Sequence, residues 1–97
     1  MIKIESEKDR LRVSGHAGYA EVGKDIVCSA VSILVVTLVE SLKKQNENIK
    51  YKLEEGNLIL YKQELGSSEK LLLSSFLIGI GMLEDMYPEY ITRLGSD

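Results

Sequence analysis

Four short segments of this 97-residue chain alternate apolar and polar side chains, and a longer apolar stretch follows each pair of them. Alternation with a period of two residues is typical of a β-strand that buries one face. Turns at 7–9 and 55–57 join the segments in pairs. The pattern therefore predicts two β-hairpins, with strands at residues 2–5, 10–14, 49–54 and 58–61.

The two longer apolar stretches have the length and spacing of helices. The first, at 26–45, is rich in β-branched residues, but it is far longer than a typical strand of roughly 4–8 residues. The second, at 68–87, ends before Pro88 and contains Gly79 and Gly81, which indicate close approach of another backbone such as that of the first helix. Its apolar side chains recur at steps of three and four, as in one stripe of a helix: Leu72, Phe76, Ile80, Leu83 and Tyr87.

The element order ββαββα predicts an α+β fold in a single domain at 1–97, with an antiparallel four-stranded sheet and two helices packed on one face. Apolar side chains surround much of the first helix, so we expect it to be buried on more than one side. The opposite face of the sheet carries charged residues that we interpret as solvated: Lys3, Glu5, Arg10, Arg12, Lys50 and Lys52.

The composition and charge of the chain argue against several classes of function. The apolar stretch from Ile26 to Val39 is shorter than the roughly 20 residues of a membrane span, and no signal peptide is apparent, so we expect a cytoplasmic protein. A formal net charge of −3 argues against direct binding of nucleic acid. The chain has one cysteine and one histidine, which excludes an intrachain disulfide and a zinc site built on cysteines; we expect no metal and no cofactor.

Those two residues, His16 and Cys28, flank a glycine-rich loop at 15–23. With Asp25 as the N-cap of the first helix, Cys28 would be its third residue, where backbone N–H groups are free. The positive end of a helix favours a thiolate over a thiol, and free N–H groups near Cys28 and Ser29 can hold an oxyanion. An imidazole within reach would act as general acid and base in acyl transfer.

Plainer interpretations of the same residues remain open. A lone cysteine beside apolar neighbours is usually a small buried side chain, and a lone histidine after a strand is usually a polar loop residue. Asp25 can act as the N-cap of the helix whether or not it also has a catalytic role. Spacing alone does not decide between these roles, because Cys–His pairs have no universal interval.

The longer string of residues is more specific. Gly15-His16-Ala17, followed by Gly23-Lys24-Asp25-Ile26-Val27-Cys28-Ser29-Ala30-Val31-Ser32, closely resembles the ribosomal-processing cysteine protease family. Gly81 and Tyr87-Pro88-Glu89-Tyr90-Ile91 are similar to the family's C-terminal pattern, so the resemblance spans essentially the whole chain as one cysteine-protease domain.

The resemblance implies a bacterial endopeptidase that removes the N-terminal extension of ribosomal large-subunit protein 27, cutting after an aromatic residue. It implies Cys28 as nucleophile and His16 as general acid and base, with Asp25 as an orienting residue, and a homodimer without cofactor. The substrate-binding loop would include Gly15, Ala17, Gly18 and Gly23.

Two other functions remain open. One is a non-catalytic module that docks on a ribosomal precursor or ribosomal RNA through the sheet face. The other is a thiol redox sensor based on Cys28.

Overall fold

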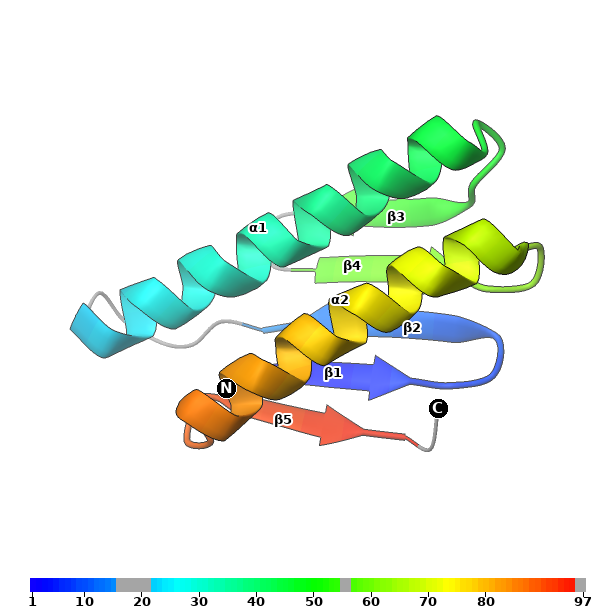
Figure 1. The fold of residues 1–97 in the computed structure, drawn as a ribbon. Coiled ribbons are helices and arrows are strands. Elements are labelled where there is room, and N and C mark those ends of the chain that lie inside the picture. The colour runs from blue at the N-terminus through cyan, green and yellow to red at the C-terminus, as the bar shows by residue number, and fades with distance from the viewer. Residues whose placement is uncertain (16–21, 55–56, 96–97) are drawn as a thin grey trace.

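The protein has two layers, a five-stranded sheet and two helices that lie across one of its faces (Figure 1). The computed structural model describes residues 1–15, 22–54 and 57–95, with the backbone alone at 22–25. The elements in chain order are β1 (Ile2–Ser6), β2 (Arg10–Ser14), α1 (Val22–Gln45), β3 (Tyr51–Glu54), β4 (Asn57–Tyr61), α2 (Ser67–Met86) and β5 (Ile91–Leu94).

The sheet is mixed, and its strand order is β3-β4-β2-β1-β5. The two predicted hairpins are confirmed, because β1 pairs with β2 and β3 with β4, both antiparallel. Antiparallel pairing of β2 with β4 joins the hairpins in the middle of the sheet. The prediction of four antiparallel strands is wrong, since β5 returns after α2 and pairs in parallel with β1 at the far edge.

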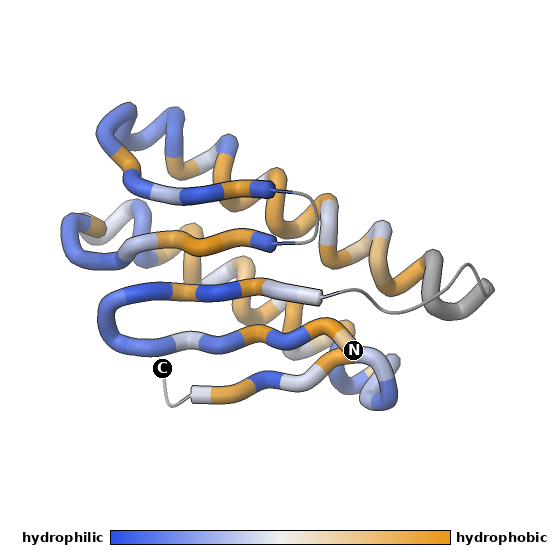
Figure 2. The backbone as a smooth tube through the Cα atoms, turned by 180° about the vertical axis from the view of Figure 1, so that it is seen from behind, coloured by the Kyte–Doolittle hydropathy of each residue, from blue (hydrophilic) through white to orange (hydrophobic). Residues whose placement is uncertain are grey.

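The core lies between the sheet and the helices. Alternate strand residues turn their apolar side chains toward the helices, and Leu11, Leu60, Leu42 and Ile80 are completely buried there. Figure 2 shows this alternation as orange and blue segments along the strands, with the helices behind. Apolar alternation on one face and polar residues on the other is the pattern expected of a sheet covered on one side.

Helix α1 is buried on one side only, so the expectation of burial on several sides is wrong. Its inner stripe, at steps of three and four, packs on the core: Val27, Val31, Val35, Leu38, Val39 and Leu42. Ile33 on the outer side remains 62% exposed, because a two-layer fold offers a helix one sheet to pack against. By length and composition alone, Ile26–Gln45 is apolar enough to cross a membrane, a test that core helices of soluble proteins also pass.

Helix α2 follows its predicted stripe. Phe76 and Ile80 are buried, and the other stripe residues are partly buried against the core. A side chain at Gly79 would meet Leu34 of α1, as expected, but through that residue's side chain rather than its backbone. A side chain at Gly81 would meet Arg93 of β5 instead.

The loop after β4 is tied to the first hairpin through Lys62. Its ammonium group donates hydrogen bonds to Ser6 Oγ at 2.9 Å and to the Glu7 carbonyl at 2.6 Å, and its backbone N–H donates to the Asp9 carbonyl. These contacts hold the end of the β1–β2 hairpin against the start of the β4–α2 connection.

Candidate active site

A cleft of about 430 Å³ opens between α1 and the sheet, at the end where β2 stops and β4 begins. Its size is in the range of small-molecule and peptide subsites. Most of its lining is apolar, and the lining residues are Ile2, Val13, Gly15, Cys28, Val31, Ser32, Val35, Val36, Leu53, Glu54, Asn57 and Leu58.

Cys28 lies in the wall of this cleft. It is half-buried, and the helix places Val31, Ser32 and Val35 on the same side at steps of three and four. The thiol therefore sits on a rigid element, beside an apolar surface that can hold a substrate side chain. Cys28 therefore packs partly against the core and is partly exposed at the cleft.

Gly15 enters the same cleft from the end of β2. Its φ of +91° is a conformation that favours glycine, and an added Cβ would lie 2.5 Å from the carbonyl oxygen of Met1. The residue predicted for the substrate-binding loop therefore lines the cleft that contains Cys28. The close passage of β2 beside the N-terminal residue requires a glycine at this point.

The predicted start of the helix is wrong. We expected Asp25 as N-cap, but α1 begins at Val22, so Asp25 lies inside the first turn and Cys28 is the seventh helical residue. Only the first four N–H groups of a helix lack an intrahelical acceptor, so those of Cys28 and Ser29 are not free in this helix. The oxyanion hole near these two residues therefore stays a prediction, without the free helix-end N–H groups on which we based it.

Several predicted site residues have no structural description. His16, Ala17 and Gly18 lie outside the described residues, and for Asp25 the side chain is not described. Gly23 was expected in the loop but belongs to the first turn of α1. The roles of His16 as general base and of Asp25 as orienting residue stay predictions.

Most residues of the cleft wall were not predicted from the sequence. Val31, Val35 and Val36 follow Cys28 along α1, and their helical spacing from Cys28 was available in the sequence. Leu53 and Asn57 come from the second hairpin, some 25 positions later, and only the folded sheet brings them there. Among residues 1–15, 22–54 and 57–95, no three His, Cys, Asp or Glu gather as a metal site.

Comparisons with protein-family models and with solved structures both find proteins similar to this chain. The model of the family described as cysteine protease Prp matches residues 1–92. The structure of an essential ribosomal processing protease Prp from S. aureus, in complex with a covalently linked product peptide, superimposes with a TM-score of 0.85 at 21% identity, covering 99% of this chain and 100% of that one. A structure of the same S. aureus protease with a substrate peptide also has a TM-score of 0.85, at 20% identity and the same coverage.

A third structure, SMU.848 from Streptococcus mutans, has a TM-score of 0.73 at 28% identity and covers 97% of this chain and 90% of that one. No curated protein matches the sequence. The structural likenesses establish the shared fold, and the family match extends over all but the last few residues. The chain therefore belongs to the cysteine protease Prp family.

Proposed function

We propose that this cysteine protease removes the N-terminal extension of bacterial ribosomal large-subunit protein 27, cutting after an aromatic residue. The observation that carries the proposal is the position of Cys28, half-buried in the wall of an apolar cleft in a chain of the Prp family. The S. aureus relative is described as a ribosomal processing protease and is seen with substrate and product peptides, which supports a peptide substrate of this kind.

In the proposed mechanism, the Cys28 thiolate attacks the scissile carbonyl carbon, and His16 accepts the thiol proton. The C–N bond of the tetrahedral intermediate breaks as the imidazolium returns that proton to the leaving amine. Water, deprotonated by the imidazole, then hydrolyses the thioester and regenerates the thiol. His16 follows Gly15 directly in the chain, and Gly15 lines the cleft, which supports this assignment.

The apolar wall suits the proposed specificity. Val31, Val35 and Leu53 offer a surface on which the ring of an aromatic residue can be removed from water. Burial of a large apolar side chain is worth about 1.5–3 kcal/mol, which corresponds to roughly a tenfold to hundredfold preference. We expect replacement of the aromatic residue by alanine in the substrate to reduce kcat/KM by about that factor.

The test is cleavage of a peptide that spans the processing site of protein 27, followed by mass spectrometry. We expect wild type to cut it once, Cys28→Ala to be inactive, and Ser29→Ala, the neighbouring exposed position, to retain activity. His16→Ala should reduce kcat by about 10²–10⁴-fold, as expected for loss of a general base. Equal cleavage by wild type and Cys28→Ala would refute the proposal.

We further infer a homodimer in the cytoplasm. Exposed apolar side chains on both helices support the dimer: Ile26 and Ile33 of α1, with Leu71, Ile78 and Met82 of α2. Light scattering should give twice the monomer mass for wild type and the monomer mass for Ile33→Glu. Recovery of the protein in the membrane fraction of cells would contradict the location.

A further inference from the structure

The sheet face opposite the helices is not covered by any described element, as both views show (Figure 1, Figure 2). The strand register places two rows of neighbouring side chains on it. One row is Lys52, Ile59 and Arg12, joined by the pairings of β3 with β4 and of β4 with β2. The next row contains Tyr61 and Arg10, which are paired, and Lys50, whose carbonyl accepts from the Tyr61 N–H at 3.0 Å.

Each row therefore has one apolar or aromatic side chain with a cation on either side. We call the four cations Arg10, Arg12, Lys50 and Lys52 the basic sheet face. The one ion pair among the described residues joins Lys43 and Glu40 of α1, so none of these four is paired with a carboxylate there. Two carboxylates of the described strands share this face: Glu5 on the internal strand β1 stands opposite Arg12 without forming an ion pair, and Glu54 ends β3 two residues after Lys52.

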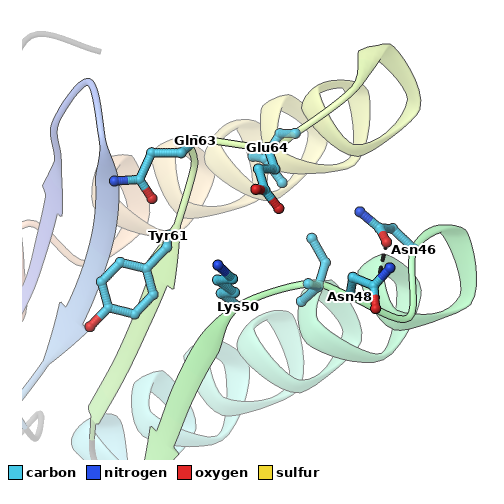
Figure 3. Close-up of a pocket in the computed structure, with 8 residues that line it drawn as sticks. Asn46, Asn48, Lys50, Tyr61, Gln63 and Glu64 are labelled. Carbon is cyan, nitrogen blue, oxygen red and sulfur yellow. Dashed lines mark hydrogen bonds between the residues drawn. The ribbon is translucent and has the colours of Figure 1, made fainter.

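A second cleft of about 290 Å³, whose lining is partly polar and partly apolar (Ile49 and Leu65), adjoins this surface at the start of β3 (Figure 3). Tyr61 and Lys50 line it together with Gln63 and Glu64 from the β4–α2 connection and with Asn46 and Asn48 from the α1–β3 connection. The side-chain oxygen of Asn46 already accepts from the Asn48 N–H at 2.9 Å. The side-chain amides of Asn48 and Gln63 each carry donors and an acceptor, which is what the edge of a nucleobase requires.

We propose that the basic sheet face and the adjoining cleft bind single-stranded RNA, with phosphates on the four cations and a base stacked on Tyr61. Clustered cations without carboxylate partners complement a phosphate backbone. An aromatic ring between cations, beside amide side chains, favours an RNA base over an acidic peptide, which needs the cations only. Stacking on a side chain also requires an unpaired base, and this favours a single strand over a duplex.

This surface goes beyond the proposed proteolysis and is separate from it. The cleft with Cys28 lies between α1 and the sheet, whereas the basic sheet face lies on the other side of the same strands. The overall charge of −3 led us to expect no nucleic-acid partner. The register shows that the chain concentrates positive charge on one face while the acidic residues lie mainly elsewhere.

The experiment measures the fluorescence anisotropy of a labelled single-stranded RNA of about 12 nucleotides. Three to four phosphate contacts predict a slope of log K against log salt of roughly −2 to −3. Arg10→Gln/Arg12→Gln should weaken binding by about tenfold or more at about 50 mM salt and reduce the slope by about 1.4. Tyr61→Leu should weaken binding by about fivefold or more and leave the slope unchanged, because it removes stacking and no charge.

The matched control is Lys44→Gln/Lys70→Gln, which makes the same change in net charge at exposed lysines on the two helices. We expect its RNA affinity to stay within about twofold of wild type, and Lys50→Gln/Lys52→Gln to repeat the loss if the arginine variant fails to fold. Equal losses in the face and control variants, salt-independent binding, or no binding would overturn the proposal. So would tighter binding of a glutamate-rich peptide or of duplex RNA, which would assign the surface to an acidic protein or to a duplex.

Discussion

Gly15 allows a sharp test of the geometry at the entrance of the cleft. In Gly15→Ala, the new side chain must adopt a φ near +91°, a region that costs an L-residue about 1–2 kcal/mol. Its Cβ would also lie 2.5 Å from the backbone oxygen of Met1, and because that atom belongs to the main chain, the backbone just before β1 must shift. Forcing an extra carbon into a packed site typically costs about 1–3 kcal/mol.

The two costs together predict a loss of about 2–5 kcal/mol in the free energy of unfolding. That is a large fraction of the roughly 5–15 kcal/mol typical of a small domain. Urea denaturation measures it directly, and we expect a lower midpoint with an unchanged m-value, because the surface exposed on unfolding stays the same.

Gly79→Ala is the matched control, since it makes the same chemical change in the middle of α2. There the new Cβ would lie 3.2 and 3.3 Å from the two terminal carbons of Leu34, a flexible side chain that can move slightly. Alanine is better than glycine in a helix by about 1 kcal/mol, so we expect stability within about 1 kcal/mol of wild type. A Gly15→Ala variant as stable as Gly79→Ala would refute the assigned backbone conformation.

Two further predictions concern the free energy of unfolding, and a third concerns the pKa of Lys43. Leu60→Ala, at a completely buried position, should cost about 2–5 kcal/mol in urea denaturation; a cost below about 1 kcal/mol would mean that this position is not core. Lys62→Met removes the hydrogen bonds from its ammonium group to Ser6 Oγ and to the Glu7 carbonyl and should cost about 1–3 kcal/mol, whereas Lys70→Met at an exposed position should change stability by less than about 0.5 kcal/mol. The hydrogen bond to Glu40 raises the pKa of Lys43 above its usual value, so Glu40→Gln should lower that pKa in an NMR titration. Because the pKa is raised in the folded state, the pair's small stabilisation is present at neutral pH and disappears as the pH rises through the folded value; an unchanged titration would show that the pair does not form in solution.

The sequence predicted the hairpins and α2 well because their signals are local. Alternation and a nearby turn define each hairpin, and a stripe at steps of three and four defines α2. Strand β5 was missed for a physical reason. Its four residues, Ile91 to Leu94, do not alternate between apolar and polar side chains. Arg93 lies beside Gly81 of α2, and Leu94 is 49% exposed at the sheet edge. Its parallel partner β1 is also some 90 positions away in the sequence, so no local turn signal indicates that the two strands pair.

The start of α1 was misplaced because a local capping signal competed with helix propagation. Asp25, just after Lys24 and two residues after a glycine, has the character of an N-cap, yet the helix continues back through Gly23 to Val22. The roles of the site residues were predicted from the resemblance to the family. The residues that surround Cys28 became known only from the structure. Cys28 could be identified from the motif, whereas the contributions of Leu53 and Asn57 to the cleft require the folded second hairpin.

The earlier start of α1 changes where the reactivity of Cys28 must originate. The effect of a helix end on charge falls off within the first turn, and Cys28 lies in the second. Helix α1 therefore fixes the position of the nucleophile and supplies the apolar wall beside it, but it does not supply the free N–H groups that we first assigned to it. Thiol activation in the proposed mechanism depends on His16, whose neighbour Gly15 lines the same cleft. In the proposed mechanism, a rigid helix places the nucleophile Cys28, and the base is the residue that follows Gly15 in the sequence.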